Sequence, residues 1–524
     1  MRVLFTDPIF LFVLLPLACV VFYAVAPRLG KVAGIGWLLL VSLLFYASWG
    51  VRPLLVLLAA IAVNFLVAYF LLTIPDEKPH RRYVLWSGLA YDFAVLIWFK
   101  YRLAALSAGA PLPFAALSPA IPVGISFYTF QQAVLLIDAY NRDASVVAFF
   151  GRLGSLREKA RGFLNHAFFV SFFAHVLIGP IVYLEEFQPQ IASRTFGRKR
   201  RRDLEVGLTL IVIGLFKKFI MADRLARIAD PVFEAAAAGH GHGALTTAAA
   251  LAGTAAFYMQ LYFDFSGYTD IALGLARLFG IRFPMNFYSP LKAAGIMDYY
   301  RRWHMTLTRA IARFFYTPLA LAGTRFAAQR KLKGLPARML GQWLPLLINF
   351  QAIALWHGAR LTFVLFGLFH GVWYVCETEM GRLPAYRRWR ERSSERSRLI
   401  VGRAVVTLLM PLSLAMFRSS SVAAYFHLLH HMVQPYGSWH AGVSPSDAAM
   451  IVAAVAVIAL LPNSMELLRR YRPGIATYDN ESYTVKVLNF AWRPNWLWAL
   501  GMGAVALLTA SWASAAAPFV YLGF

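Results

Sequence analysis

The chain has 524 residues, of which 59% are hydrophobic and 15% are charged, with a formal net charge of +26. Soluble globular proteins carry about 25% charged residues, so this composition excludes an ordinary soluble protein of this length. The basic residues stand in short loops between apolar runs, as they do in cytoplasmic loops of membrane proteins. A nucleic-acid-binding protein would instead gather its basic residues on one soluble face. No nucleic-acid partner is therefore expected.

Apolar runs recur along the whole chain and predict membrane-spanning or re-entrant helices, about 11–13 of them. No soluble domain interrupts them, so residues 1–524 are predicted to form one all-α, polytopic membrane domain. In chain order the runs cover 10–25, 37–48, 54–73, 84–99, 121–138, 164–184, 206–222, 245–263, 343–357, 361–377, 402–417, 448–462 and 495–512.

Loop charges predict the topology of the first half. Arg28 and Lys31 follow the first apolar run, which puts that loop in the cytoplasm and the N-terminus outside. Successive crossings then place the basic loops at 78–82 and 142–161 in the cytoplasm as well.

The apolar segment 164–184 is predicted to re-enter the membrane and return to the same side. A full crossing would place the very basic loop 198–202 outside, against the charge rule. His175, Gly179 and Pro180 interrupt the segment, and irregular backbone at membrane depth is tolerated inside protein or beside a cavity.

Ionisable residues gather between about 258 and 372, where they mark a functional interior. Asp264 and Asp270 stand six residues apart in an apolar run. They either line a reaction chamber or form a buried structural network, with Asp264 bonded across helices and Asp270 capping or pairing with an arginine. The residue pattern leaves both readings open.

A second cluster contains Arg301, Arg302, Trp303 and His304. Paired arginines at a membrane boundary are suited to the phosphates of an acyl donor, although positive-inside placement and snorkelling explain them equally well. His304 is either catalytic or a hydrogen-bonded histidine at the membrane interface.

A third cluster runs from Asn349 to Trp356 and His357, with Gly358 after the histidine. A buried imidazole stays neutral at physiological pH and is able to accept a proton from a hydroxyl. The alternative is a core histidine bonded to a backbone carbonyl. No serine-hydrolase elbow or phosphate-binding glycine loop is present, and no metal site is expected.

These clusters resemble the signature of the membrane-bound O-acyltransferase family, and more narrowly its alginate O-acetyltransferase branch. The resemblance covers about residues 90–430 and implies an all-α fold around a central funnel or tunnel. The matching pieces are Tyr-Phe-Asp-Phe-Ser-Gly-Tyr-Thr-Asp at 262–270, Gly-Leu-Ala-Arg-Leu-Phe-Gly at 274–280, Arg-Phe-Pro-Met-Asn-Phe at 282–287, Tyr-Arg-Arg-Trp-His-Met-Thr-Leu-Thr-Arg at 300–309 and Trp-His-Gly-Ala at 356–359.

The resemblance implies that His357 is the essential histidine and that His304 is a second active-site residue. It leaves Arg301, Arg302 and Trp303 as supporting candidates for substrate or donor binding. The other supporting candidates are Asp264, Asp270, Trp356 and Asn349.

The reaction implied is transfer of an acetyl group from a cytoplasmic thioester, acetyl-CoA, to or towards a hydroxyl of an extracytoplasmic polysaccharide. The resemblance further implies a bacterial inner-membrane location and a separate extracytoplasmic partner protein that handles acetyl groups. A transporter or flippase for a lipid-linked or acylated substrate is the alternative, because it too would use intramembrane histidines and acids. A non-catalytic assembly scaffold, a longer acyl group and an acyl-carrier-protein donor also stay open.

Overall fold

The structure is a computed structural model that describes residues 3–107, 121–239, 245–434, 442–477, 490–512 and 519–520. Helices dominate these ranges, which contain no β-strand, and an isolated bridge joins Pro284 to Ile475. Every apolar run predicted from the sequence lies in or overlaps a helix. The predicted all-α fold is therefore confirmed.

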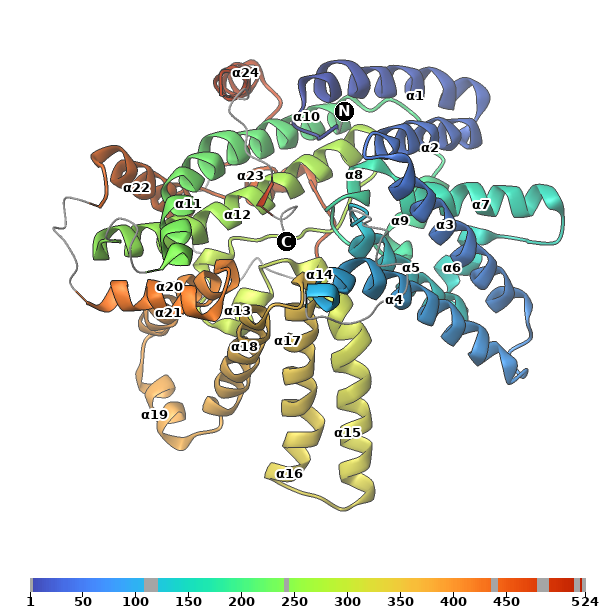
Figure 1. The fold of residues 1–524 in the computed structure, drawn as a ribbon. Helices are drawn as coiled ribbons and strands as arrows, with labels where there is room; N and C mark the ends of the chain where they lie inside the picture. The colour runs from blue at the N-terminus through green and yellow to red at the C-terminus, as the bar shows by residue number, and fades with distance from the viewer. Residues whose placement is uncertain are drawn as a thin grey trace.

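The helices from η1 to α9 lie together on one side of the molecule, at the right in Figure 1. Their bounds are η1 (Phe10–Leu14), α1 (Leu15–Leu29), α2 (Lys31–Ala47), α3 (Val51–Thr73), α4 (His80–Ser107), α5 (Ile125–Tyr140), α6 (Ala144–Phe150), α7 (Leu156–Ser171), α8 (Phe173–Val176) and α9 (Leu184–Ala192).

The middle of the chain supplies three long helices that run alongside one another, followed by short helices near the centre of the molecule (Figure 1). Their bounds are α10 (Arg201–Phe216), η2 (Lys217–Ala222), α11 (Asp223–Ala238), α12 (Thr247–Leu278), η3 (Pro290–Lys292), α13 (Ile296–Tyr300), α14 (Met305–Ile311) and η4 (Ala312–Tyr316).

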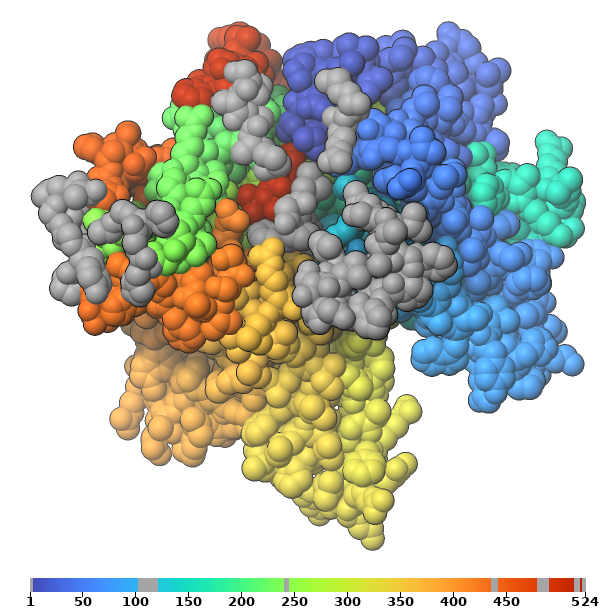
Figure 2. All heavy atoms as spheres, viewed as in Figure 1, coloured from blue at the N-terminus to red at the C-terminus, as the bar shows by residue number. Residues whose placement is uncertain are grey.

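In the C-terminal part, the region from α15 to α17 projects away from the rest of the molecule (Figures 1 and 2). The helices are α15 (Thr317–Gln329), α16 (Leu335–Arg338), η5 (Met339–Trp343), α17 (Leu344–His357), α18 (Leu361–Met380), α19 (Pro384–Arg392), α20 (Glu395–Arg418), α21 (Val422–Val433), α22 (Pro445–Leu460), α23 (Ser464–Leu467), η7 (Arg469–Tyr471) and α24 (Trp496–Ala510).

Within the described ranges, five helical stretches are long and apolar enough to cross a bilayer. Three shorter apolar helices, α2, α22 and α24, accompany them. The chain is therefore a multi-pass integral membrane protein, while the predicted total of 11–13 spanning or re-entrant helices stays a prediction. The five stretches are Phe10–Leu29, Val51–Thr73, Leu335–His357, Leu361–Met380 and Glu395–Arg418.

Large apolar side chains on the outer surface agree with this assignment. Phe12 on η1 is 73% exposed and Leu507 on α24 is 76% exposed. Leu408 on α20 is also exposed. Because water-soluble monomers rarely expose so much apolar surface, lipid is the expected neighbour of these helices.

Contacts between loops agree with the predicted topology. Asp76 forms ion pairs with Arg81 at 3.0 Å and with Arg142 at 2.7 Å. These contacts join the two basic loops that the charge rule assigns to the cytoplasm. The loops therefore lie on one face of the molecule.

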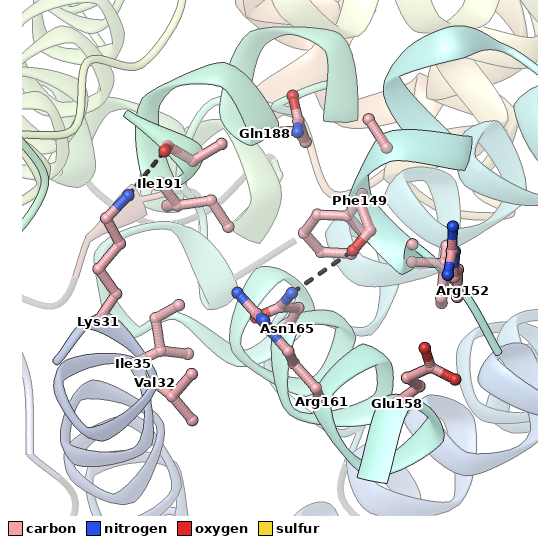
Figure 3. Close-up of a pocket in the computed structure, with 14 residues that line it drawn as sticks. Lys31, Val32, Ile35, Phe149, Arg152, Glu158, Arg161, Asn165, Gln188 and Ile191 are labelled. Carbon is pink, nitrogen blue, oxygen red and sulfur yellow. Dashed lines mark hydrogen bonds between the residues drawn. The ribbon is translucent and has the colours of Figure 1, made fainter. Parts of the chain in front are cut away.

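A cavity of about 400 Å³ links this face to the segment after the predicted re-entry (Figure 3). Lys31 donates to the carbonyl of Ala192 at 2.7 Å, while Arg152 and Arg161 line the same cavity. The residues before and after 164–184 thus meet on one side, and helix α7 stops at Ser171. This geometry agrees with re-entry and return.

Helices α10 and α12 approach each other unusually closely through two glycine pairs. A Cβ on Gly267 would lie 2.8 Å from the carbonyl oxygen of Gly214, and one on Gly274 would lie 2.6 Å from that of Gly207. Small residues permit this kind of helix contact in membranes. The packing fixes α12, almost wholly buried from Ala256 onwards, as the central helix of the fold.

Candidate active site

His357 is the last residue of α17, and Gly358 follows with φ of 153°. A side chain at Gly358 would be strained at this φ and would approach the ring of Phe363 to 3.0 Å. The imidazole of His357 meets the ring of Phe417 edge-on, with centroids 4.8 Å apart. The glycine thus ends the helix and leaves the histidine at its tip, among aromatic rings.

His304 is the residue before α14 and has left-handed backbone geometry, with φ of 43° and ψ of 48°. Residues other than glycine rarely adopt this conformation, and when they do they are often found at functional sites. The side chain is 4% exposed, and its ring meets that of Phe265 edge-on at 4.7 Å. Burial lowers the pKa of His304 to about 3, so the ring is neutral at physiological pH.

Asn286 fixes the orientation and the tautomer of His304. Its Oδ1 lies 3.0 Å from Nδ1 of His304, 3.2 Å from the backbone nitrogen of Thr306 and 2.9 Å from the Thr306 hydroxyl. A backbone N–H always donates, so the contacted atom of Asn286 is the amide oxygen. His304 therefore carries its proton on Nδ1, and its Nε2 is the accepting nitrogen.

The two histidines line the same cavity, which has a volume of about 40 Å³ and holds a few water molecules at most. His357 interacts electrostatically with His304 and with Lys100. Apart from Thr308, the other side chains around the cavity are apolar or aromatic: Leu261, Phe265, Tyr300, Trp303, Leu307, Ile353, Phe366, Leu414 and Phe417.

Asp264 and Asp270 lie in buried ion pairs outside this cavity lining. Asp264 accepts from Lys218 at 2.8 Å, and Lys218 also pairs with Asp223 at 2.9 Å. Asp270 pairs with Lys217 at 2.6 Å. The geometry agrees with the structural-network reading, although the partner of Asp270 is a lysine rather than the arginine considered from the sequence.

The chain segment near the C-terminus completes this network. The backbone nitrogen of Val520 donates to Oδ2 of Asp264 at 2.9 Å, and Phe519 is 2% exposed. The Phe519 ring meets Tyr268 edge-on at 4.8 Å and lies 4.6 Å from the Lys218 ammonium. The two aspartates therefore tie η2 and the C-terminal segment to α12.

The arginine cluster divides into residues with different surroundings. Arg302 is fully buried and pairs with Asp298 at 2.7 Å, whereas Arg301 is exposed. Trp303 lines the histidine cavity and stacks on Tyr299 with ring centroids 5.6 Å apart. Of this cluster, Trp303 and His304 reach the cavity.

Trp356 and Asn349 are buried on α17 but are not part of the cavity lining. Trp356 packs edge-on against Phe130 at 4.5 Å, and the ammonium of Lys100 lies 5.4 Å from its ring centroid. Lys100 was not among the sequence candidates. Its signal was a lone cation at the end of the apolar run 84–99.

Asn286 lies in the Arg-Phe-Pro-Met-Asn-Phe motif, but the sequence does not predict its role, because its contact with His304 depends on the fold of the 279–304 segment. As for metal ligands, no group of three or more His, Cys, Asp and Glu side chains in the described ranges is arranged to hold an ion. Metal-free catalysis stays a prediction.

Comparisons with known proteins show the family of the chain. Residues 126–417 match the model of the membrane-bound O-acyltransferase family, a region that contains both histidines and all the candidate residues above. A peptidoglycan O-acetyltransferase of Helicobacter pylori is 34% identical over 70% of this chain and 69% of the relative.

Two further relatives are named for other substrates. A probable alginate O-acetylase of Pseudomonas syringae is 28% identical over 87% of this chain and 81% of its own length. A teichoic acid D-alanyltransferase of Bacillus subtilis is 27% identical over 48% of this chain and 58% of its own length. The family model covers more than half of the chain, and the chain therefore belongs to the membrane-bound O-acyltransferase family and is an O-acyltransferase.

Proposed function

We propose that this protein moves an acetyl group from acetyl-CoA on the cytoplasmic side to, or towards, a hydroxyl of an extracytoplasmic polysaccharide. The observation that carries the proposal is the enclosed cavity lined by both His357 and His304. The relatives named as a peptidoglycan O-acetyltransferase and a probable alginate O-acetylase support an acetyl group and a polysaccharide acceptor.

His357 acts as the general base. It takes the proton of the attacking hydroxyl as the oxygen adds to the thioester carbonyl carbon. The tetrahedral adduct then collapses, the carbon–sulfur bond breaks, and the departing thiolate receives the proton from the His357 imidazolium. An ester and a free thiol are the products, so protons and electrons balance without a cofactor.

His304 positions a reactant through its Nε2. Its one N–H is directed to Asn286, so in the neutral ring the remaining nitrogen accepts a hydrogen bond and does not donate one. This favours a contact with the attacking hydroxyl over stabilisation of an oxyanion. A positive charge is better suited to stabilise the oxyanion, and Lys100, whose ammonium lies over the ring of Trp356 next to His357, is the cation assigned to that role.

The size of the cavity favours a small acyl group. Its volume of about 40 Å³ is bounded by the rings of Phe265, Trp303, Phe366 and Phe417. A long acyl chain would have to displace several of these rings, and core rearrangements of that kind are costly. An acetyl group needs a smaller adjustment.

The acceptor hydroxyl belongs either to a sugar or to a partner protein that relays acetyl groups outside the membrane. A bacterial inner-membrane location fits a cytoplasmic donor and an extracytoplasmic acceptor. Co-purification from detergent-solubilised membranes tests for the partner, and recovery of the enzyme alone with full polysaccharide acetylation would contradict the relay.

The central experiment measures acetyl-CoA turnover by purified protein in detergent, comparing wild type with His357→Ala. We expect a loss of roughly 10²–10⁴-fold, the usual contribution of a positioned base. An unchanged elution profile and melting temperature would show that the variant is folded. Near-wild-type turnover in the variant would exclude His357 as the base, and substrate movement without thioester cleavage would favour a transporter or flippase.

A further inference from the structure

A third cavity lies beyond the side chains that form one wall of the histidine cavity. It has a volume of about 830 Å³ and forms a groove between the C-terminal half of α18, helix α19 and the start of α20. Its lining combines aromatic and charged side chains, among them Trp373, Glu377, Tyr386, Trp389, Arg390 and Arg398. Nothing in the reaction described above uses this groove.

Helix α19 presents two kinds of surface. Tyr386 and Trp389, three residues apart, turn towards the groove with ring centroids 5.3 Å apart, and Arg390 lies beside them. Arg387 and Arg388 are exposed and do not line the groove. The groove therefore offers stacking surfaces next to one arginine, Arg390. Two carboxylates also line it, Glu395 and Glu377, and Glu377 accepts from the backbone nitrogens of residues 296 and 297.

The start of α20 holds α19 in place. Arg398 donates from one guanidinium nitrogen to the carbonyls of Arg390 at 2.7 Å and Ser393 at 2.8 Å. These bonds join the end of α19 to α20 and make the groove a preformed feature of the fold.

The groove opens on the face that carries the basic loops. Glu379, at the end of α18, lies 3.4 Å from both Arg338 and Arg382, and the indole of Trp343 donates to it at 3.1 Å. The basic segments around 330–338 and 382–403 therefore meet on one side. By the charge rule that side is the cytoplasm.

One layer of side chains separates the groove from the histidine cavity. Trp373 lines the groove and lies 6.1 Å from His370, measured between ring centroids. His370 in turn shares a hydrogen bond of 2.7 Å with the hydroxyl of Tyr300, which lines the histidine cavity, as does Phe366. From Trp373 to Phe366 the distance along α18 is about 10 Å, at 1.5 Å per residue.

We propose that this groove binds the nucleotide end of coenzyme A, with the adenine against Trp389 and Tyr386 and the phosphates near Arg390. The proposal rests on the acetyl-CoA donor proposed above. The flexible arm of the donor then passes Trp373 and the Tyr300–His370 pair and brings the thioester to His357. An aromatic surface beside arginine matches a planar base joined to phosphates.

Two arginines on α19 provide a matched test. Arg390→Ala and Arg388→Ala each remove one positive charge from the same helix, so both variants weaken the long-range attraction of the negatively charged donor equally. Of the two arginines, Arg390 alone lines the groove. We expect the KM for acetyl-CoA to rise roughly tenfold in Arg390→Ala, the scale of one charge-assisted contact, with kcat little changed. Equal KM values in the two variants would overturn the assignment.

A truncated donor tests the stacking surface. S-acetylpantetheine carries the same thioester as acetyl-CoA but lacks the nucleotide. The measured quantity is the kcat/KM for acetyl-CoA divided by the kcat/KM for S-acetylpantetheine. We expect this ratio to be roughly tenfold lower in Trp389→Ala than in wild type, the scale of one base–aromatic stack. A ratio equal to that of wild type would overturn the groove as the nucleotide site.

The two proposals fail in different ways. Absence of acetyl-CoA turnover in wild type argues against the proposed function itself. Turnover in wild type with no change of KM or donor ratio in the α19 variants argues against the groove alone. Preference for an acetylated carrier protein over acetyl-CoA would also overturn the nucleotide assignment, because such a donor has no adenine.

Discussion

Replacing Asn286 by alanine tests how far the reaction depends on the tautomer of His304. Asn286 is fully buried, and its amide oxygen accepts three hydrogen bonds, one from His304 and two from Thr306. An alanine leaves three buried donors without their acceptor. At about 1 kcal/mol each, the lower end for such groups, the free energy of unfolding falls by about 3 kcal/mol.

The same substitution lets His304 rotate and exchange tautomers. We expect kcat to fall roughly 100-fold, the lower end of what a positioned acid or base contributes. The assay is acetyl-CoA turnover under saturating donor, run beside a thermal melt in the same detergent. A variant that loses stability but keeps the wild-type kcat would refute the positioning role.

Asn286→Asp separates positioning from stability. The carboxylate keeps all three accepted bonds but pairs with a positively charged imidazole, and therefore raises the pKa of His304 from its low value. If the neutral ring is required, turnover by the variant is low at neutral pH and rises as the pH increases, whereas wild type shows no such rise from this group. A pH profile identical to that of wild type would contradict the reasoning.

Three further predictions concern the frame around the site. Gly267→Ala places a Cβ 2.8 Å from the Gly214 carbonyl and is expected to cost about 1–3 kcal/mol in a thermal melt, whereas Gly36→Ala, with no atom within 4 Å, is expected to be neutral or slightly stabilising. Equal melting temperatures would show that the α10–α12 contact is loose. Lys100→Gln is expected to lower kcat roughly tenfold, with partial recovery in Lys100→Arg, since it removes the positive charge that is assigned to the oxyanion next to His357; a kcat unchanged in Lys100→Gln would count against this role. Phe519→Ala is expected to reduce the free energy of unfolding by about 3 kcal/mol, measured by denaturant titration, because the ring is 2% exposed; a loss below about 1 kcal/mol would mean that the C-terminal contact is weak.

The sequence alone determined the class of the protein and the positions of its helices. A bilayer forces every backbone polar group to be satisfied internally, so long apolar runs become helices wherever they occur. The same constraint predicted the break at 164–184, where His175 and Pro180 interrupt the apolar run. The motif around His357 by itself left a core histidine as the alternative. The family resemblance made His357 the predicted essential residue, and its role as the base stays a prediction.

Only the tertiary structure decided which polar residues share a site. Asp264 and His304 belong to the same signature region, yet Asp264 pairs with Lys218 while His304 reaches the cavity of His357. The rotation of α12 about its own axis decides which of its side chains meet which neighbour. The glycine contacts with α10 fix this rotation, and loop charges carry no information about it. The tautomer of His304 is equally a tertiary property, since Asn286 lies eighteen residues away and is brought to it by the fold.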